Sequence, residues 1–142
     1  MYRRNPDPEF ETVDLNTLCE RSDIVSIHLA LNDQTRGMVG EAQIGRMKKN
    51  AMVINVARGA VADEEALAQA IEEKRIGALG VDVYSVEPFG KEHPFSRVLD
   101  RDNVCLTPHM AWGSIEARNR CIAKVAENIA AFYRGESLNR VD

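Results

Sequence analysis

The sequence has 142 residues, a formal net charge of −4 at pH 7 and a hydrophobic share of 44%, which suits one globular domain with its own core. It has no long basic stripe, which argues against a nucleic-acid partner, and no apolar run near the ~20 residues that cross a bilayer. The segment MYRRNPDPEF lacks the apolar stretch of a signal peptide. The three cysteines are unclustered in apolar settings, so we expect buried free thiols, no metal site and a reducing cytoplasm.

Short helices alternate with apolar strands in the first half of the chain. Residues 1–12 read as an irregular entry, and Asp14 is placed to cap the first helix. The predicted elements are, in order, a helix over Leu15–Arg21, a strand over Ile24–Leu29, a helix over about Glu41–Met47 and a strand over Met52–Val56.

The second half continues the alternation. Asp63 is placed to cap the next helix, and Gly77 suits the position just past its end. Ser114 is placed to cap the last helix, whose apolar residues keep a helical period until Gly135. The predicted elements are a helix from Asp63 to about Arg75, a strand over Ala78–Val83, a proline-bounded loop over roughly 84–102 with a helical turn near Pro94, a strand over Val104–Thr107 and the last helix.

This order of elements predicts an α/β fold. Strands of nearly unbroken apolar character, separated by helices, are typical of a parallel sheet with helices on both faces. Ligands of such sheets bind beyond the carboxyl ends of the strands. The residues that follow each strand are therefore the first candidates for a functional site.

Three charged or titratable residues follow the last three strands. Arg58 can bind a carboxylate with two hydrogen bonds and polarise a neighbouring carbonyl. His109 can exchange a proton with a hydroxyl oxygen, and Glu87 can orient the ring and raise its proton affinity. Together they suit the reduction of a 2-keto acid, with hydride supplied by a nicotinamide cofactor.

Each of these residues also has a plainer interpretation. Arg58 can be an ordinary surface residue, and Glu87 a solvated loop acid. His109 can cap the final helix, and Asp82 can simply close its strand by bonding the loop backbone. The three compatible residue types at three strand ends favour the catalytic interpretation.

Three segments resemble the signature blocks of the D-isomer-specific 2-hydroxyacid dehydrogenases, in particular the glyoxylate/hydroxypyruvate reductase and glycerate dehydrogenase branch. They are VINVARGAVADEEALAQAI, GALGVDVYSVEP and NVCLTPHMAWGS, and they space Arg58, Glu87 and His109 as in that family. The resemblance implies that His109 is the acid/base, Glu87 its partner and Arg58 the clamp for the substrate carboxylate. It also implies contacts to NAD or NADP, with Asp82 at the nicotinamide, from these residues: Ala30, Thr35, Val56, Ala57, Arg58, Asp82 and His109.

Trp112 and the pair Arg3 and Arg4 each have a functional and a structural interpretation. Trp112 matches a substrate-pocket position of the glycerate/hydroxypyruvate branch, but it can equally pack at the start of the last helix. Arg3 and Arg4 lie near the point where the family binds the adenine ribose, and basic residues there suit the 2′-phosphate of NADP. A solvated terminus explains the same two arginines.

The sequence departs from the family in one respect. No two of its nine glycines are separated by a single residue, so the G-x-G-x-x-G fingerprint that grips the pyrophosphate is absent. We therefore expect residues 1–142 to be a partial NAD(P)-binding domain, without the glycine-rich first part and the substrate domain. Such a chain would bind dinucleotide weakly, catalyse little alone and form homo-oligomers through its exposed edge strand Ile24–Leu29.

Two other functions remain open at this point. The C-terminal binding proteins, which are dinucleotide-sensing corepressors, have similar blocks that include a tryptophan like that of His109-Met110-Ala111-Trp112. The third interpretation is a truncated remnant without catalytic activity.

Overall fold

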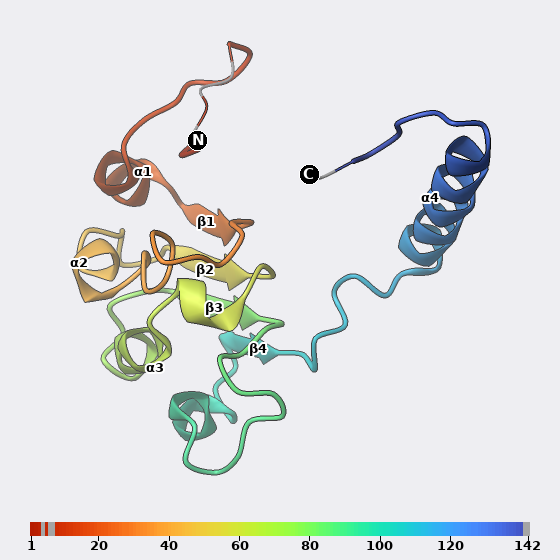
Figure 1. The fold of residues 1–142 in the computed structure, drawn as a ribbon. Helices are drawn as coiled ribbons and strands as arrows, with labels where there is room; N and C mark the ends of the chain where they lie inside the picture. The colour runs from red at the N-terminus through yellow and green to blue at the C-terminus, as the bar shows by residue number, and fades with distance from the viewer. Residues whose placement is uncertain (4, 6–7, 141–142) are drawn as a thin grey trace. The chain divides into compact units, whose positions relative to one another are not determined.

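The computed structural model describes residues 1–3, 5 and 8–140. It divides into two compact units, Met1–His109 and Met110–Asp142. Figure 1 shows a four-stranded sheet with adjoining helices in the first unit and one long helix in the second. No helix of the described part of the chain is long and apolar enough to cross a membrane.

The sheet of the first unit is entirely parallel, as predicted. Its four strands lie side by side in the order in which they occur in the chain. Their carboxyl ends therefore meet at one edge, where the predicted site residues follow. The strands are β1 (Ile24–Ile27), β2 (Met52–Asn55), β3 (Ala78–Val81) and β4 (Val104–Leu106).

Helices connect these strands. Asp14 and Asp63 cap α1 and α3 as predicted, each accepting a backbone N–H of the first turn, and a helical turn begins at Pro94. The elements are α1 (Leu15–Arg21), α2 (Glu41–Ile44), the 3₁₀ turn η1 (Gly59–Val61), α3 (Glu64–Glu72) and the 3₁₀ turn η2 (Pro94–Val98).

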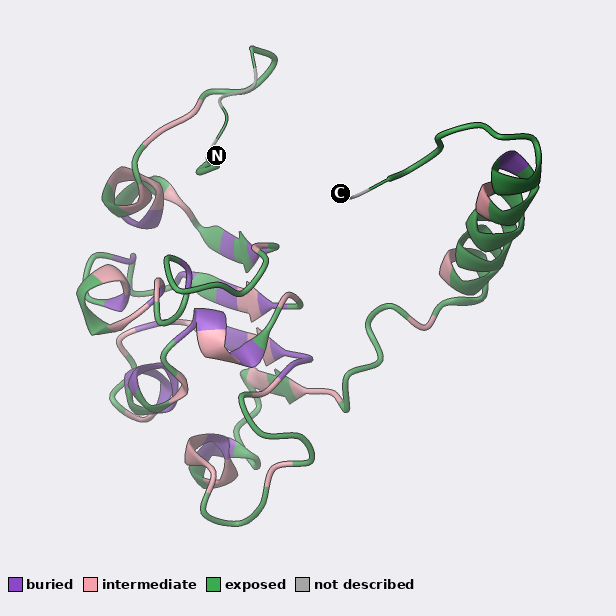
Figure 2. Ribbon diagram, viewed as in Figure 1, coloured by how far each residue is buried: buried purple, intermediate pink, exposed green. Residues whose placement is uncertain are grey.

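The predicted parallel α/β sheet with helices is confirmed, and within the first unit the helices cover one face of the sheet. Val25 and Ile27 of β1 are buried, whereas Ile24, the first residue of the strand, is 59% exposed. Figure 2 shows this alternation along β1, and Figure 1 shows α1, α2 and α3 on the same side of the sheet. The period of two arises because successive side chains of a strand point to opposite faces.

The three cysteines differ in burial. Cys19 of α1 is buried, but Cys105 and Cys121 are exposed, so the expectation of three buried thiols was wrong for two of them. Cys105 is paired in register with Gly80 of β3 and belongs to the uncovered face.

Gly77 has a different role from the predicted one. Helix α3 ends at Glu72, and Lys74 adopts the left-handed conformation with a φ of +57°. A Cβ at Gly77 would lie 2.7 Å from the carbonyl oxygen of Asn50. The glycine is therefore needed for close approach of two backbones where β3 begins.

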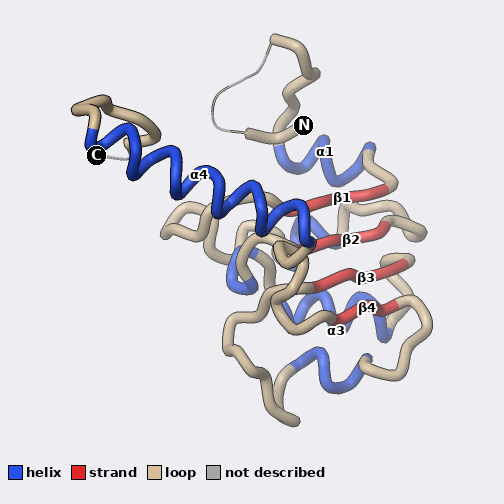
Figure 3. Tube along the Cα trace, turned by 90° about the vertical axis from the view of Figure 1, so that its right-hand side faces the viewer, coloured by secondary structure: helices blue, strands red, loops and turns tan. Residues whose placement is uncertain are grey.

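The second unit consists mainly of α4 (Ile115–Tyr133), seen along its length in Figure 3. Ser114 caps it as predicted, and Gly135 follows its end with a φ of +74°. Its apolar stripe is largely exposed. The exposed members are Ile115, Ile122, Val125, Ile129, Phe132 and Tyr133.

Candidate functional site

The turn after β2 is built by a buried asparagine that sequence reasoning missed. Asn55 is 2% exposed. Its side-chain oxygen accepts the Ala57 N–H at 3.1 Å, and its amide donates to the Arg58 carbonyl at 3.1 Å. Because one side chain satisfies both backbone groups, it fixes the path of the chain that carries Arg58. A polar residue at the end of an apolar strand was the available signal.

Gly59 joins this turn to the turn after β3. A Cβ at Gly59 would lie 2.1 Å from the carbonyl carbon of Tyr84 and 2.3 Å from the nitrogen of Ser85. Only glycine permits this contact between two backbones. The close approach brings the backbone next to Arg58 beside the loop that carries Glu87.

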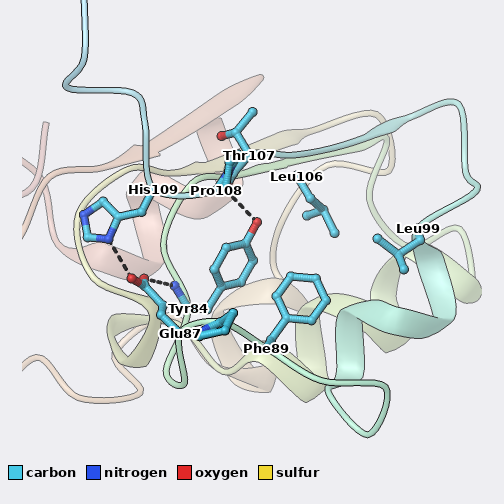
Figure 4. Close-up of a pocket in the computed structure, with 9 residues that line it drawn as sticks. Tyr84, Glu87, Phe89, Leu99, Leu106, Thr107, Pro108 and His109 are labelled. Carbon is cyan, nitrogen blue, oxygen red and sulfur yellow. Dashed lines mark hydrogen bonds and ion pairs between the residues drawn. The ribbon is translucent and has the colours of Figure 1, made fainter.

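Glu87 and His109 form a hydrogen-bonded pair, shown in Figure 4. The Nδ1 of His109 lies 2.7 Å from Oε2 of Glu87, and Oε1 of Glu87 accepts the Tyr84 N–H at 2.8 Å. The bond to His109 and then the Tyr84 N–H lower the pKa of the Glu87 carboxyl. The acid is therefore held in its charged form, as the partner of an acid/base histidine must be.

His109 itself has a φ of +53°. A left-handed conformation is uncommon for a residue with a side chain, and it concentrates at functional sites. Here the conformation follows the end of β4 at Leu106 and accompanies the contact between the imidazole and Glu87.

A second set of hydrogen bonds ties the ends of β3 and β4 together. The Tyr84 hydroxyl donates to the Thr107 carbonyl at 2.9 Å, and the Thr107 hydroxyl donates to Oδ1 of Asp82 at 2.6 Å. Burial, followed by the charges of Asp82 and Glu87, raises the pKa of Tyr84 to about 12. Sequence reasoning missed Tyr84 and Thr107, whose partners lie far away in the chain.

A pocket of about 380 Å³ lies against the Glu87–His109 pair. Figure 4 shows the rings of Tyr84 and Phe89 and the side chain of Leu99 around it. The pocket is therefore largely apolar beside its titratable pair. The lining residues are Tyr84, Glu87, Pro88, Phe89, Leu99, Leu106, Thr107, Pro108 and His109.

Arg58 is placed at the adjoining strand end but is not engaged with that pair. Its side chain is exposed, and Nη1 donates to the neighbouring Ala57 carbonyl at 2.7 Å. No ion pair to Arg58 occurs among the residues that the structure describes. The guanidinium can therefore turn toward an anion without breaking an ion pair.

The predicted cofactor residues at the end of β1 form a closed loop. Thr35 is buried, donating its hydroxyl to the Ala30 carbonyl at 2.7 Å and accepting the Asn32 N–H at 2.8 Å. A hollow of about 560 Å³ lies beside this loop and includes Tyr2 in its lining. Val56 and Ala57 are at least partly exposed at the end of β2.

The remaining predicted residues are Arg3, Arg4 and Trp112. Arg3 is exposed, and Arg4 is outside the described residues. Trp112 is 64% exposed and belongs to the second unit, whereas His109 ends the first. The structure therefore leaves the proposed pocket role of Trp112 untested.

The arrangement can hold an acid/base group in one orientation. With Nδ1 of His109 bound to a carboxylate, the ring exchanges a proton with a ligand through Nε2. A parallel sheet with polar residues beyond the carboxyl ends of its strands is typical of nucleotide-binding α/β proteins.

The model of the D-isomer specific 2-hydroxyacid dehydrogenase NAD-binding domain matches residues 2–111, and the chain belongs to that family. It is 44% identical over 129 residues to the glyoxylate reductase of Thermofilum pendens, covering 91% of this chain and 37% of that protein. The chain therefore spans well under half the length of this curated relative.

Solved structures agree in fold. The D-lactate dehydrogenase of Lactobacillus jensenii with NAD⁺ matches with a TM-score of 0.85 and 29% identity, covering 99% of this chain and 47% of that one. A glyoxylate reductase from Paecilomyes thermophila matches with a TM-score of 0.83 and 33% identity, covering 97% and 43%. The resemblance inferred from the signature blocks is confirmed at the level of the family.

Proposed function

We propose that residues 1–142 are a partial NAD(P)-binding domain of a D-2-hydroxyacid dehydrogenase, which reduces a small 2-keto acid such as hydroxypyruvate or glyoxylate. The observation that carries the proposal is the 2.7 Å bond between Glu87 and His109, formed at the sheet edge where Arg58 also emerges. The similarity to glyoxylate reductases supports the substrate class.

Arg58, His109 and Glu87 have separate roles in the proposed reaction. Arg58 binds the substrate carboxylate through its planar fork. His109 passes a proton from Nε2 to the carbonyl oxygen, and the Glu87 carboxylate orients the ring through its contact with Nδ1. The nicotinamide, when bound, supplies the hydride.

The described residues fit a dinucleotide at the strand ends. Ala30, Val56 and Ala57 are small or apolar and accessible there, and the hollow beside Thr35 is open to a flat ring. Asp82, buried at the end of β3, is the proposed partner of the nicotinamide end. The basic side chain of Arg3 suits the 2′-phosphate of NADP, so we expect NADP to be preferred over NAD. A comparison of NADPH with NADH as ligands tests this directly.

The proposal includes the oligomeric state, the cellular compartment and the affinity for dinucleotide. The open strand β1 and the uncovered face of the sheet suit a homo-oligomer. The three free cysteines suit the reducing cytoplasm. Because the sequence contains no glycine-rich fingerprint, we expect the chain to bind dinucleotide more weakly than a complete domain.

The test is cofactor binding by the 142-residue chain, followed by fluorescence of NADPH or by calorimetry, with hydroxypyruvate reduction followed at 340 nm. We expect weak binding, and a loss of keto-acid response in Arg58→Ala. Arg101→Ala is the matched control, because this exposed arginine precedes β4 at the opposite edge of the sheet. Arg58→Ala should change the free energy of unfolding by no more than about 0.5 kcal/mol.

The outcomes separate the alternatives. Binding with reduction above background supports the dehydrogenase, even in this partial domain. Binding without reduction points to a dinucleotide-sensing scaffold. No binding up to millimolar cofactor, with Arg58→Ala indistinguishable from the unsubstituted chain, contradicts a functional site in this chain.

A further inference from the structure

A second pair of a glutamate and a histidine lies behind the candidate catalytic pair. Glu64 begins α3 and His93 precedes η2, and their side chains are only 11% and 7% exposed. The Nε2 of His93 lies 3.2 Å from Oε2 of Glu64. The Nδ1 of His93 accepts the Phe95 N–H at 3.3 Å, so Nε2 carries the proton that is donated to the carboxylate.

This buried carboxylate also holds the turn after β3. Its Oε1 accepts the Ser85 N–H at 2.8 Å, and its Oε2 accepts the Ser85 hydroxyl. The preceding N–H, that of Tyr84, is donated to Glu87. Two consecutive backbone N–H groups are thus bound by two carboxylates, one buried and one in the candidate site.

The ring of His93 contacts residues on both sides of Glu87 in the sequence. The ring of His93 lies with its centroid 5.9 Å from that of Tyr84, 4.7 Å from that of Phe89 and 5.2 Å from that of Phe95. Tyr84 precedes Glu87 and Phe89 follows it. The segment that carries the candidate acid is therefore held at both ends by contacts with one buried pair.

We propose that Glu64 and His93 are positioning residues, which hold the segment 84–89 so that the Glu87 carboxylate meets Nδ1 of His109. The proposal rests on the proposed function in that Glu87 is taken as the partner of the acid/base histidine. In this proposal, Glu64 and His93 determine the position of the Glu87 carboxylate and do not themselves contact substrate or cofactor.

The neighbouring residue provides a matched control. Glu65 follows Glu64 on α3, but its side chain is 59% exposed and pairs with Arg97 at 2.6 Å. Both residues lie in the first turn of the helix, so removal of either carboxylate changes the charge at that end equally. Only Glu64 has a hydrogen bond to the segment 84–89.

The experiment compares the 142-residue chain with Glu64→Ala, Glu64→Gln and Glu65→Ala by NMR. The readouts are the titration midpoint of the Glu87 side-chain carboxyl carbon and the exchange rates of the Tyr84 and Leu79 amides. For Glu64→Ala we expect the Glu87 pKa to rise toward the ordinary carboxyl value and the Tyr84 amide to exchange about tenfold faster. The Leu79 amide, in the centre of the sheet, should keep its rate.

Glu64→Gln and Glu65→Ala should change the two NMR readouts less than Glu64→Ala does. Glu64→Gln retains one acceptor for Ser85 but cannot accept from His93 with its second atom, so we expect a smaller shift in the same direction. This variant decides the matter if Glu64→Ala does not fold. Glu65→Ala should leave both readouts unchanged.

Three results would overturn the proposal. The first is an unchanged Glu87 pKa and Tyr84 exchange rate in a folded Glu64 variant. The second is an equal change in Glu65→Ala, and the third is a matching acceleration at Leu79, which would mean general destabilisation. None of these readouts needs cofactor or substrate, so the proposed function can fail while the positioning role stands, and the reverse.

Discussion

The ends of β3 and β4 differ from the end of β2 in how completely their polar groups are satisfied. At β3 and β4, Glu87, His109, Tyr84 and Thr107 are joined by hydrogen bonds. At β2, the guanidinium of Arg58 donates to the carbonyl of the preceding residue, Ala57, and forms no ion pair within the described part of the chain. The comparison teaches that the fold itself orients the candidate proton-transfer group, whereas the candidate anion-binding arginine is left free to reorient.

The largest expected effect comes from breaking the contact between the two regions. In Gly59→Ala the new Cβ would lie 2.1 Å from the backbone of Tyr84, so one of the two turns must move. We expect a loss of about 3 kcal/mol in the free energy of unfolding, measured with denaturant. Gly80→Ala, whose Cβ would lie 3.8 Å from Ile54, should stay within about 1 kcal/mol. Equal losses in the two variants would contradict the role of the close contact.

The next effect is confined to the Arg58 side. Asn55→Ala leaves the Ala57 N–H and the Arg58 carbonyl without their partner, and we expect a loss of about 2 kcal/mol. Asn55→Asp keeps the acceptor and loses the donor, so its loss should be smaller. The Glu87 pKa should not change in either variant; a change would mean that the two regions are not independent.

A smaller effect is expected on the β3–β4 side. Tyr84→Phe removes the donor to the Thr107 carbonyl, which should cost about 1 kcal/mol near neutral pH. Because the folded-state pKa is raised to about 12, the contribution of the neutral hydroxyl is complete below the unfolded value of about 10 and is lost as pH rises through 12.

Ultraviolet difference absorbance checks this prediction. The wild-type chain should show one late phenol ionisation near the raised pKa of Tyr84, and Tyr84→Phe should lack it. Tyr133→Phe is the control, because Tyr133 is 84% exposed. Retention of the late ionisation in Tyr84→Phe would assign it to another tyrosine.

The smallest effect concerns the candidate acid. The folded-state pKa of Glu87 is lowered, chiefly by its bond to His109, so its contribution to stability is present above the unfolded value of about 4.3. It is lost as pH falls through the lowered pKa. Since the pair is more than a third exposed, Glu87→Gln should cost only about 0.5 kcal/mol at pH 6. Unfolding curves of the two proteins should coincide once the pH lies well below the lowered pKa of Glu87; a difference that persists there would contradict a charge-based contribution.

Much of the fold could be predicted from local signals. Asp14, Asp63 and Ser114 cap their helices as their residue types require, and the apolar runs mark all four parallel strands. The strands end earlier than the runs do, because pairing with a neighbour decides their length. The uncovered face could not be predicted, since apolar residues such as Ile24 and Met52 occur there as they would on a buried face.

The candidate site was predictable in part. Parallel topology brings the residues after β2, β3 and β4 to one edge, and Glu87 and His109 do meet there. The supporting residues were not predictable, because the bond of Tyr84 to Thr107 and that of Ser85 to Glu64 join distant positions in the chain. The role of Gly59 depends on a close approach that only three-dimensional packing creates.

The strand order has a consequence for biosynthesis. Each strand lies beside the one made immediately before it, so the sheet can grow one strand at a time as the polypeptide leaves the ribosome. No strand must wait for a partner encoded far downstream, which keeps the loops that must close during folding short. His109 follows the last of these strands, so the hydrogen-bonded pair of Glu87 and His109 is the final part of the first unit to be assembled during translation.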